Sequence, residues 1–312
     1  MKTSVQAGVV GALACGTLLA ALAFGRHDGG GLADDAAPPK GPYVALGDSY
    51  TAGPRIPDQT GKPAGCDRSD RNYPALVADE LGLAAADFRD VSCSGATISD
   101  LSTSQSTDDG VNPAQLSALS ADTRLVTIGI GGNDIGFASL VRECVTAGAI
   151  YHAMGSGKYL PEDAPCSRRY VSQGTDEVQE RITTAGERLS GALSEVRNRA
   201  PKAQVYVVGY PAILPSEETD CGREMGLAPG DVTFLHAREQ QLNAMLRKRA
   251  EAAGARYVDT YTPSEGRDAC SAEDTRWVEP LIPRSPAASV HPNERGERGM
   301  ADAVLRALDA HG

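Results

Sequence analysis

The stretch that decides the fold stands at residues 43–49 and reads YVALGDS. Four apolar or aromatic residues form a short strand signal, and Gly-Asp-Ser follows at once as a polar turn. A continuous apolar run bounded by glycine is typical of a strand that is buried on both faces, as in a parallel sheet. Ligands of open parallel sheets bind beyond the carboxyl ends of the strands, so this turn is a candidate functional site.

Four further runs of this kind follow along the chain, and helical patterns alternate with them. The runs stand at residues 88–93, 125–130, 205–208 and 256–259. Apolar residues at helical spacing predict helices at 176–200, 231–253 and 294–309. Pro201 and Gly254 stand where the first two of these helices would end. Strands that alternate with helices in this way predict an open parallel sheet that is covered by helices on both faces.

The N-terminus predicts export. Lys2 precedes an apolar run that ends near the small-residue triplet at 21–23, as in a secretory signal peptide. We therefore expect the protein to be secreted. The expected organisation is a signal peptide at 1–23, a linker rich in Gly, Pro, Ala and Asp at 24–41, and one folded domain at 42–312. An uncleaved membrane anchor and lipoprotein processing at Cys15 are the alternatives.

Six cysteines remain outside the expected signal peptide. An even number of cysteines in an exported chain predicts three disulfides. Many pairings are open, and the sequential one closes the shortest loops, so we expect Cys66–Cys93, Cys144–Cys166 and Cys221–Cys270. No two of these cysteines have the close spacing of a zinc site, so we expect no metal.

Polar turns rich in glycine follow three of the predicted strands, and a histidine precedes the last predicted helix. These four stretches are Gly47-Asp48-Ser49, Ser94-Gly95-Ala96-Thr97, Gly131-Gly132-Asn133-Asp134 and His291-Pro292-Asn293. We expect the turns to meet, because the carboxyl ends of parallel strands share one edge of the sheet.

These residue types suit acyl transfer. A serine hydroxyl becomes a nucleophile when a base takes its proton, and histidine is the usual base near neutral pH. The tetrahedral intermediate carries an oxyanion that needs fixed donors. The backbone N–H groups of Ser49 and Gly95 and the side-chain amide of Asn133 would supply three. Each residue also has a plainer interpretation, because Ser49 and Asn133 could cap helices and Gly95 could serve a turn alone.

The four blocks, in this order, resemble those of the SGNH (GDSL) hydrolases, and most of all the secreted lipases and esterases of actinobacteria. The resemblance covers about residues 42–310. It implies a flavodoxin-like three-layer α/β/α sandwich with a five-stranded parallel sheet, and ester hydrolysis without metal or cofactor. It also implies that Ser49 is the nucleophile, that His291 is its base, and that Ser49, Gly95 and Asn133 form the oxyanion hole.

One position departs from the family pattern. The family usually places an Asp three residues before the histidine to orient it, and here that position is Ala288. Some secreted actinobacterial relatives use a main-chain carbonyl just upstream of the histidine instead. The resemblance therefore implies that the carbonyl of Ala288 or Ser289 accepts the imidazole N–H. A distant carboxylate such as Glu279 is the alternative.

The expected function is the hydrolysis of fatty-acyl or other carboxylic esters through an acyl-enzyme on Ser49. A phospholipase A-type acyl hydrolase, a carbohydrate O-deacetylase and a non-catalytic wall-associated binding protein are the alternatives. The formal net charge of −11 argues against a nucleic-acid partner, because an acidic surface repels phosphate backbones. We expect a monomer that acts on a small-molecule or lipid ester and has no stable membrane partner. The long stretches 52–70, 99–114, 144–172 and 213–230 lack periodic pattern, and we expect them to form walls of the substrate site.

Overall fold

The computed structural model describes residues 41–154, 163–172, 174–216 and 221–310. The expected signal peptide, and all of the expected linker except Gly41, lie outside the described residues. Within the described part of the chain, no helix has both the length and the apolar character needed to cross a membrane.

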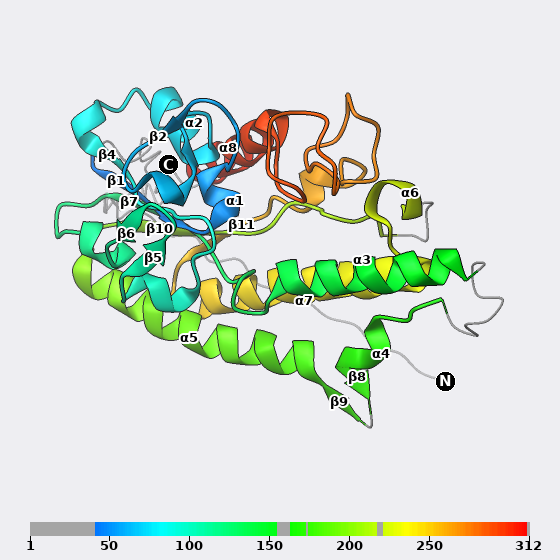
Figure 1. Ribbon diagram of the computed structural model, residues 1–312. Coiled ribbons are helices and arrows are strands. Elements are labelled where there is room, and N and C mark those ends of the chain that lie inside the picture. The colour runs from blue at the N-terminus through cyan, green and yellow to red at the C-terminus, as the bar shows by residue number, and fades with distance from the viewer. Residues whose placement is uncertain (1–40, 155–162, 173, 217–220, 311–312) are drawn as a thin grey trace, which may run out of the picture. The chain divides into compact units, whose positions relative to one another are not determined.

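A sheet of five parallel strands forms the centre of the domain (Figure 1). The strands are β1 (Tyr43–Gly47), β4 (Phe88–Asp90), β7 (Leu125–Gly129), β10 (Gln204–Val208) and β11 (Arg256–Val258). Their order in the sheet is β11-β10-β7-β1-β4. This is the flavodoxin-like order, in which the chain reverses its direction of winding between β1 and β7. The predicted fold class is confirmed.

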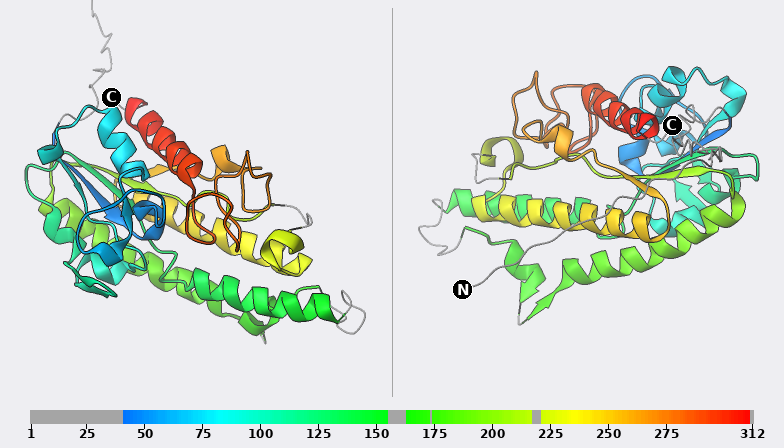
Figure 2. Two further views of the ribbon diagram at one scale, coloured as in Figure 1. Left: turned by 45° about the horizontal axis from the view of Figure 1, so that its top comes forward. Right: turned by 180° about the vertical axis from the view of Figure 1, so that it is seen from behind.

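Helices cover both faces of this sheet. On one face lie α2 (Tyr73–Glu80) and α8 (Glu294–Asp309), which contact each other. On the other lie α3 (Phe137–Ala153), α5 (Glu177–Arg199) and α7 (Pro229–Ala252), and Figure 2 shows the two groups on opposite sides. The strands feed two cores because successive side chains point to opposite faces. Val44 and Leu46 of β1 pack with α5 and α7, whereas Tyr43 and Ala45 pack with α2 and α8.

Short elements fill the connections. They are helices α1 (Ser49–Ala52), α4 (Ser167–Tyr170) and α6 (Gly222–Met225), and the hairpins β2–β3 (Gln59–Thr60, Arg68–Ser69), β5–β6 (Gln105–Thr107, Gly110–Asn112) and β8–β9 (Val171–Ser172, Thr175–Asp176). Single 3₁₀ turns stand at Ala64–Cys66, Ala85–Asp87, Ile98–Leu101, Gln115–Ala118 and Thr262–Ser264.

The expectation of irregular chain from residue 144 onward was wrong for its first ten residues. They belong to α3, which starts at Phe137 and runs to Ala153. The helix buries Leu140, Val141 and Cys144, which fall on one face at helical spacing. This face packs against α7, so tertiary contact defines the helix more clearly than its own pattern does.

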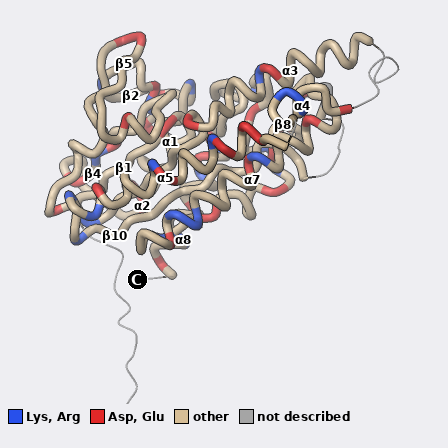
Figure 3. Tube along the Cα trace, turned by 90° about the horizontal axis from the view of Figure 1, so that it is seen from below, with Lys and Arg blue, Asp and Glu red and all other residues tan. Residues whose placement is uncertain are grey.

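Three disulfides join the described cysteines in the sequential arrangement: Cys66–Cys93, Cys144–Cys166 and Cys221–Cys270. The first closes onto the turn after β4. The second ties the middle of α3 to the chain just before α4. In the view of Figure 3, acidic and basic residues lie intermixed along the described chain.

Candidate active site

The turn after β1 presents Ser49 at the carboxyl edge of the sheet. Ser49 is the first residue of α1, and the side chain of Asp48 caps that helix by accepting a hydrogen bond from the N–H of Tyr50 at 2.9 Å. Only glycine fits at position 47, because a Cβ there would lie 2.2 Å from Thr51 Oγ1 and 2.6 Å from the carbonyl oxygen of Gly129. The strand can therefore turn into the helix within one residue.

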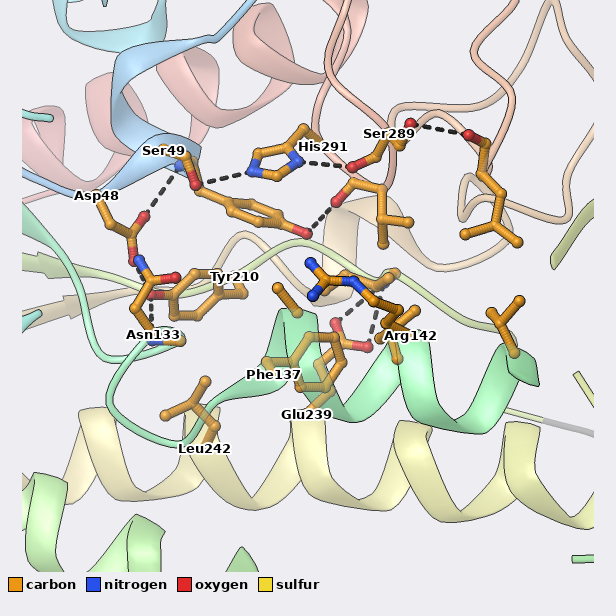
Figure 4. A pocket seen from close by; sticks show the side chains of 18 residues that line it. Asp48, Ser49, Asn133, Phe137, Arg142, Tyr210, Glu239, Leu242, Ser289 and His291 are labelled. Atoms are coloured by element: carbon orange, nitrogen blue, oxygen red, sulfur yellow. Dashed lines mark hydrogen bonds between the residues drawn. The ribbon is translucent and has the colours of Figure 1, made fainter. Parts of the chain in front are cut away.

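His291 lies against this serine. Its Nε2 is 2.8 Å from Ser49 Oγ, and its Nδ1 is 2.8 Å from the carbonyl oxygen of Ser289 (Figure 4). A carbonyl only accepts hydrogen bonds, so Nδ1 carries the proton and Nε2 is left to accept one from the serine. Of the two expected carbonyls, that of Ser289 bonds to the imidazole, while the N–H of Ala288 donates to Pro54.

The carboxylate of Glu279 supports the loop that carries His291. It is buried and accepts hydrogen bonds from the Asn293 amide at 2.7 Å and from the N–H of Arg284 at 2.8 Å. Burial works to raise the pKa of Glu279, but these hydrogen bonds and the Arg276 charge outweigh it and hold the pKa below its usual value. No hydrogen bond within the described residues joins this carboxylate to the imidazole.

The surroundings of His291 favour its neutral form. Burial lowers the pKa of the imidazole, and the hydrogen bond to Ser289 offsets part of that shift. The nearby Arg55 charge lowers the pKa further. A histidine with a lowered pKa stays unprotonated at neutral pH, which is the form that can act as a base.

The turns after β4 and β7 are joined beside Ser49. The Asn133 side-chain amide donates to the carbonyl of Ala96 at 2.9 Å, which leaves its second N–H. Asn133 does not cap α3, since the N-cap is Gly136. Gly95 has φ +78°, a left-handed conformation that favours glycine. Within the described chain, the N–H groups of Ser49 and Gly95 donate to no protein acceptor.

Two tyrosines, Tyr210 and Tyr50, support these turns, and the sequence analysis did not predict either of them. The Tyr210 hydroxyl donates to Asp48 Oδ2 and accepts from the N–H of Gly132 at 2.7 Å. Burial raises the pKa of Asp48 to about 7, against the hydrogen bonds from Tyr210 and Tyr50. Tyr50 contacts the rings of both Tyr210 and His291. The Asp134 carboxylate accepts a hydrogen bond from the N–H of Ile98 at 2.9 Å, which supports the turn after β7.

An apolar cavity of about 340 Å³ opens beside Ser49 and His291. This volume lies in the usual range for small-molecule sites. Its apolar wall consists of Phe137, Ala138, Val141, Val145, Ile213, Leu242, Leu281 and Val290. Figure 4 shows Arg142 reaching from α3 into the same space, with Glu239 on α7 behind it.

The walls match those expected only in part: Val145 and Ile213 come from two of the expected stretches. Among the described residues, 52–70 and 99–114 contribute nothing to the cavity lining. These stretches instead surround the turn after β4, where Cys66 bonds to Cys93 and the Gln105 amide donates to the carbonyl of Ser94 at 2.8 Å. The main wall is the regular helix α3, which had been expected to be partly irregular.

Comparison with known proteins agrees with this geometry. The model of the GDSL-like lipase/acylhydrolase family matches residues 45–298. The chain belongs to this family. Ser49, Gly95, Asn133 and His291 all fall within the matched residues.

Several proteins from Streptomyces are similar over most of the chain. Lipase 2 of Streptomyces coelicolor is 41% identical over 290 residues, which are 92% of each protein. The structure of phospholipase A1 from Streptomyces albidoflavus NA297 is 31% identical with a TM-score of 0.69, and the match covers 86% of this chain and 100% of that one. The extracellular lipase of Streptomyces rimosus is 28% identical with a TM-score of 0.66, over 86% of this chain and 99% of that one. This GDSL-like chain is a carboxylic ester hydrolase.

One group of side chains in the described GDSL-like domain has the spacing of metal ligands. It comprises Cys144, Cys166 and Asp231. The two cysteines are joined as a disulfide, so neither is a free thiolate ligand. The Asp231 carboxylate accepts the N–H groups of Cys166 and Ser167. This cluster therefore fixes the chain at Cys166 and Ser167 against α7.

Proposed function

We propose that the protein is a secreted lipase or esterase that hydrolyses fatty-acyl esters through an acyl-enzyme on Ser49. The observation that carries the proposal is the 2.8 Å contact between Ser49 Oγ and His291 Nε2 at the edge of an apolar cavity. A nucleophile, its base and the base's own hydrogen-bond partner are the parts that serine acyl transfer needs.

In the first half of the reaction, His291 Nε2 takes the proton of Ser49 as Oγ attacks the ester carbonyl carbon. The oxyanion that forms is held by the N–H groups of Ser49 and Gly95 and by the Asn133 amide. When this intermediate collapses, the alcohol leaves with the proton from His291, and the acyl group stays on Ser49. Water then attacks the acyl-enzyme with His291 again as base, which releases the acid and restores the serine.

The Ser289 carbonyl fixes the tautomer of His291 throughout this cycle. It carries a partial charge only, so it stabilises the imidazolium less than a carboxylate would. The dyad therefore depends on how firmly the ring is held.

The acyl chain of the substrate lies in the apolar cavity, along the face of α3 that presents Phe137, Val141 and Val145. Each methylene that leaves water for such a wall contributes about 0.8 kcal/mol. We expect the rate to rise with acyl length until the cavity is filled.

Hydrolysis of p-nitrophenyl esters from acetyl to palmitoyl tests the proposal. The mature protein is expected to turn over, with a preference for acyl chains longer than acetyl, and Ser49→Ala is expected to be inactive. Ser117→Ala, which removes an exposed hydroxyl from a turn outside the cavity lining, is the matched control and keeps full activity. Turnover by a folded Ser49→Ala protein would exclude this mechanism.

A second candidate substrate is a phospholipid, and Arg142 favours it. The guanidinium reaches into the cavity and has no ion pair within the described residues. Burial raises the pKa of the neighbouring Glu239 well above its usual value, which weakens the negative charge that would oppose a bound anion. Guanidinium groups bind phosphate through paired hydrogen bonds. One solved relative is described as a phospholipase A1.

Arg142→Gln separates the two substrates. We expect this variant to hydrolyse a soluble short-chain phosphatidylcholine about 10-fold more slowly, and a p-nitrophenyl ester of the same acyl group at the wild-type rate. Lys248→Gln removes an exposed cation from α7 and serves as the control. Equal loss on both substrates would assign Arg142 to the wall of the acyl site instead.

Secretion is supported by the N-terminal sequence and by the extracellular relative from Streptomyces rimosus. Mass analysis of the exported protein tests it, with a new N-terminus expected near residue 24. Retention of residues 1–23 on a membrane-bound protein would show an anchor instead.

A further inference from the structure

We propose that Tyr50 is a positioning residue that holds His291 in its working orientation and takes over part of the task of the missing acidic residue. The inference rests on the proposed function, in which Ser49 and His291 react together. Tyr50 directly follows the nucleophile in the chain, so one short helix, α1, carries both the serine and the group that steadies its base.

Two contacts join Tyr50 to the histidine loop. Its ring lies against the imidazole of His291, with centroids 4.9 Å apart and planes at 34°. Its hydroxyl donates to the carbonyl oxygen of Val290 at 2.5 Å. The first contact limits how the imidazole can tilt, and the second fixes the backbone on which the imidazole is mounted.

Val290 has an unusual backbone that needs such support. Its φ is +59°, a left-handed conformation that β-branched residues rarely adopt. The N–H of Val290 donates to the Glu279 carbonyl at 3.0 Å, while its own carbonyl accepts from Tyr50. Both sides of the strained residue are thus held. The left-handed turn places the Ser289 carbonyl under the imidazole Nδ1, so the orienting bond of His291 depends on Val290 keeping this conformation.

The hydroxyl is suited to this bond at every relevant pH. Burial raises the pKa of Tyr50 well above its ordinary value, and the charges of Glu239 and Asp48 add to the effect. The phenol therefore remains a neutral donor. Edge-on packing against Tyr210, with centroids 5.1 Å apart, fixes the ring from the other side.

Tyr50→Phe tests the role of the hydroxyl because it keeps the ring. We expect kcat for a p-nitrophenyl ester to fall about 10-fold or more, with KM nearly unchanged, since loss of alignment affects the chemical step. Tyr50→Leu removes the ring as well. It is expected to lower kcat further and to move the acid limb of the pH profile to higher pH, because burial is the main cause of the lowered pKa of His291.

Tyr261→Phe is the matched control. It deletes a tyrosine hydroxyl that is hydrogen-bonded to another histidine, His236, at 2.7 Å, and Tyr261 does not line the cavity. Wild-type kcat in Tyr50→Phe, or an equal fall in Tyr50→Phe and Tyr261→Phe, overturns the proposal.

A double-mutant cycle tests the route through Val290. Asparagine tolerates the left-handed conformation better than valine does, so Val290→Asn lessens the strain that Tyr50 has to hold. Tyr50→Phe should then cost clearly less kcat in the Val290→Asn background than in the wild type. Additive losses would show that the hydroxyl does not act through this carbonyl. Activity in Ser49→Ala would refute the proposed function itself, whereas an inactive Ser49→Ala beside a fully active Tyr50→Phe refutes this inference alone.

Discussion

At the scale of single residues, a carbonyl and not a carboxylate accepts the imidazole N–H of His291, so the ring needs further contacts to hold it. The imidazole is fixed by the Ser289 carbonyl on one side and by Ser49 on the other. The sequence pointed to Ser49 and His291 because each stands in a recognisable block. It could not decide between the carbonyls of Ala288 and Ser289, since every residue has a carbonyl and only the backbone path selects one. Tyr50 was missed for a similar reason, because an aromatic residue beside a strand end is usually core.

Activity should fall at low pH because of the protonation of a single residue, His291. Protonated His291 cannot take the serine proton, so kcat/KM falls as pH drops through the pKa of the imidazole. Because burial lowers this pKa, the acid limb should lie below the ordinary histidine value of 6.5. Initial rates between about pH 4.5 and about pH 8 check this. Asp48→Asn serves as the control for the other titrating group, whose pKa is about 7. A limb above 6.5 in both proteins would contradict the expected shift.

The side-chain amide of Asn133 is expected to contribute to kcat. Its amide is fixed by the Ala96 carbonyl, and we expect its second N–H to donate to the oxyanion. Asn133→Ala should lower kcat on the order of 100-fold with little change in KM, because the donor acts mainly on the transition state. Asn198→Ala, on the exposed side of α5, is the control. Loss confined to KM would assign Asn133 to substrate binding.

At the scale of elements, the turn after β4 is held by parts that lie outside the sheet. The Cys66–Cys93 disulfide joins this turn to the segment after β2. The N–H of Ser94 donates to the Cys66 carbonyl at 3.0 Å, and the side-chain amide of Gln105 donates to the Ser94 carbonyl. The five strands and the helices α5, α7 and α8 could be predicted, because their apolar patterns are long or bounded by Gly and Pro. Helix α2 was not predicted, since its eight residues are too few to show a period, and α3 depends on its contact with α7.

Removal of the Cys66–Cys93 bond should therefore lower activity before the core unfolds. We expect Cys66→Ala/Cys93→Ala to lose kcat at temperatures where its circular dichroism is still native. The control is Cys144→Ala/Cys166→Ala, which removes a disulfide of similar loop length that starts in the middle of α3 and should lose stability with less effect on kcat. Equal kcat in the two pairs would show that the disulfide does not support the turn after β4.

At the scale of the described domain, the strand order explains why the site forms where it does. The winding reverses between β1 and β7, so the turns that carry Ser49 and Asn133 diverge there and leave a crevice at the sheet edge. The predicted alternation of strands and helices was enough to anticipate this edge. The cavity itself could not be anticipated, because its main wall is a helix whose extent was not evident from the sequence.

Buried carboxyls make the stability of the domain depend on pH. Burial raises the pKa of Asp48 to about 7 and of Asp231 to about 6, and raises those of Asp90, Asp134, Asp268, Glu239 and Glu297. The folded state then binds more protons than the unfolded chain, so the free energy of unfolding falls as pH rises through this range. The lowered pKa values of Glu279, His236 and His291 act in the opposite direction at lower pH.

We therefore expect Tm to be higher at about pH 6 than at about pH 8. Calorimetry or thermal circular dichroism measures this directly. Glu239→Gln should weaken the dependence, because glutamine can still accept the Ile213 N–H and does not ionise. A Tm that rises with pH over this range would mean that these carboxyls are paired or solvated in solution.

The central claim is that Ser49, activated by His291, forms the acyl-enzyme. The most direct test is to treat the protein with an alkyl phosphonate that reacts with activated serines and to locate the label by peptide mass analysis. The account predicts one label, on the peptide that contains Ser49, with labelling strongly slowed in His291→Ala and unaffected in Ser117→Ala. A fully active enzyme that remains unlabelled at Ser49, or that carries the label on another serine, would contradict it.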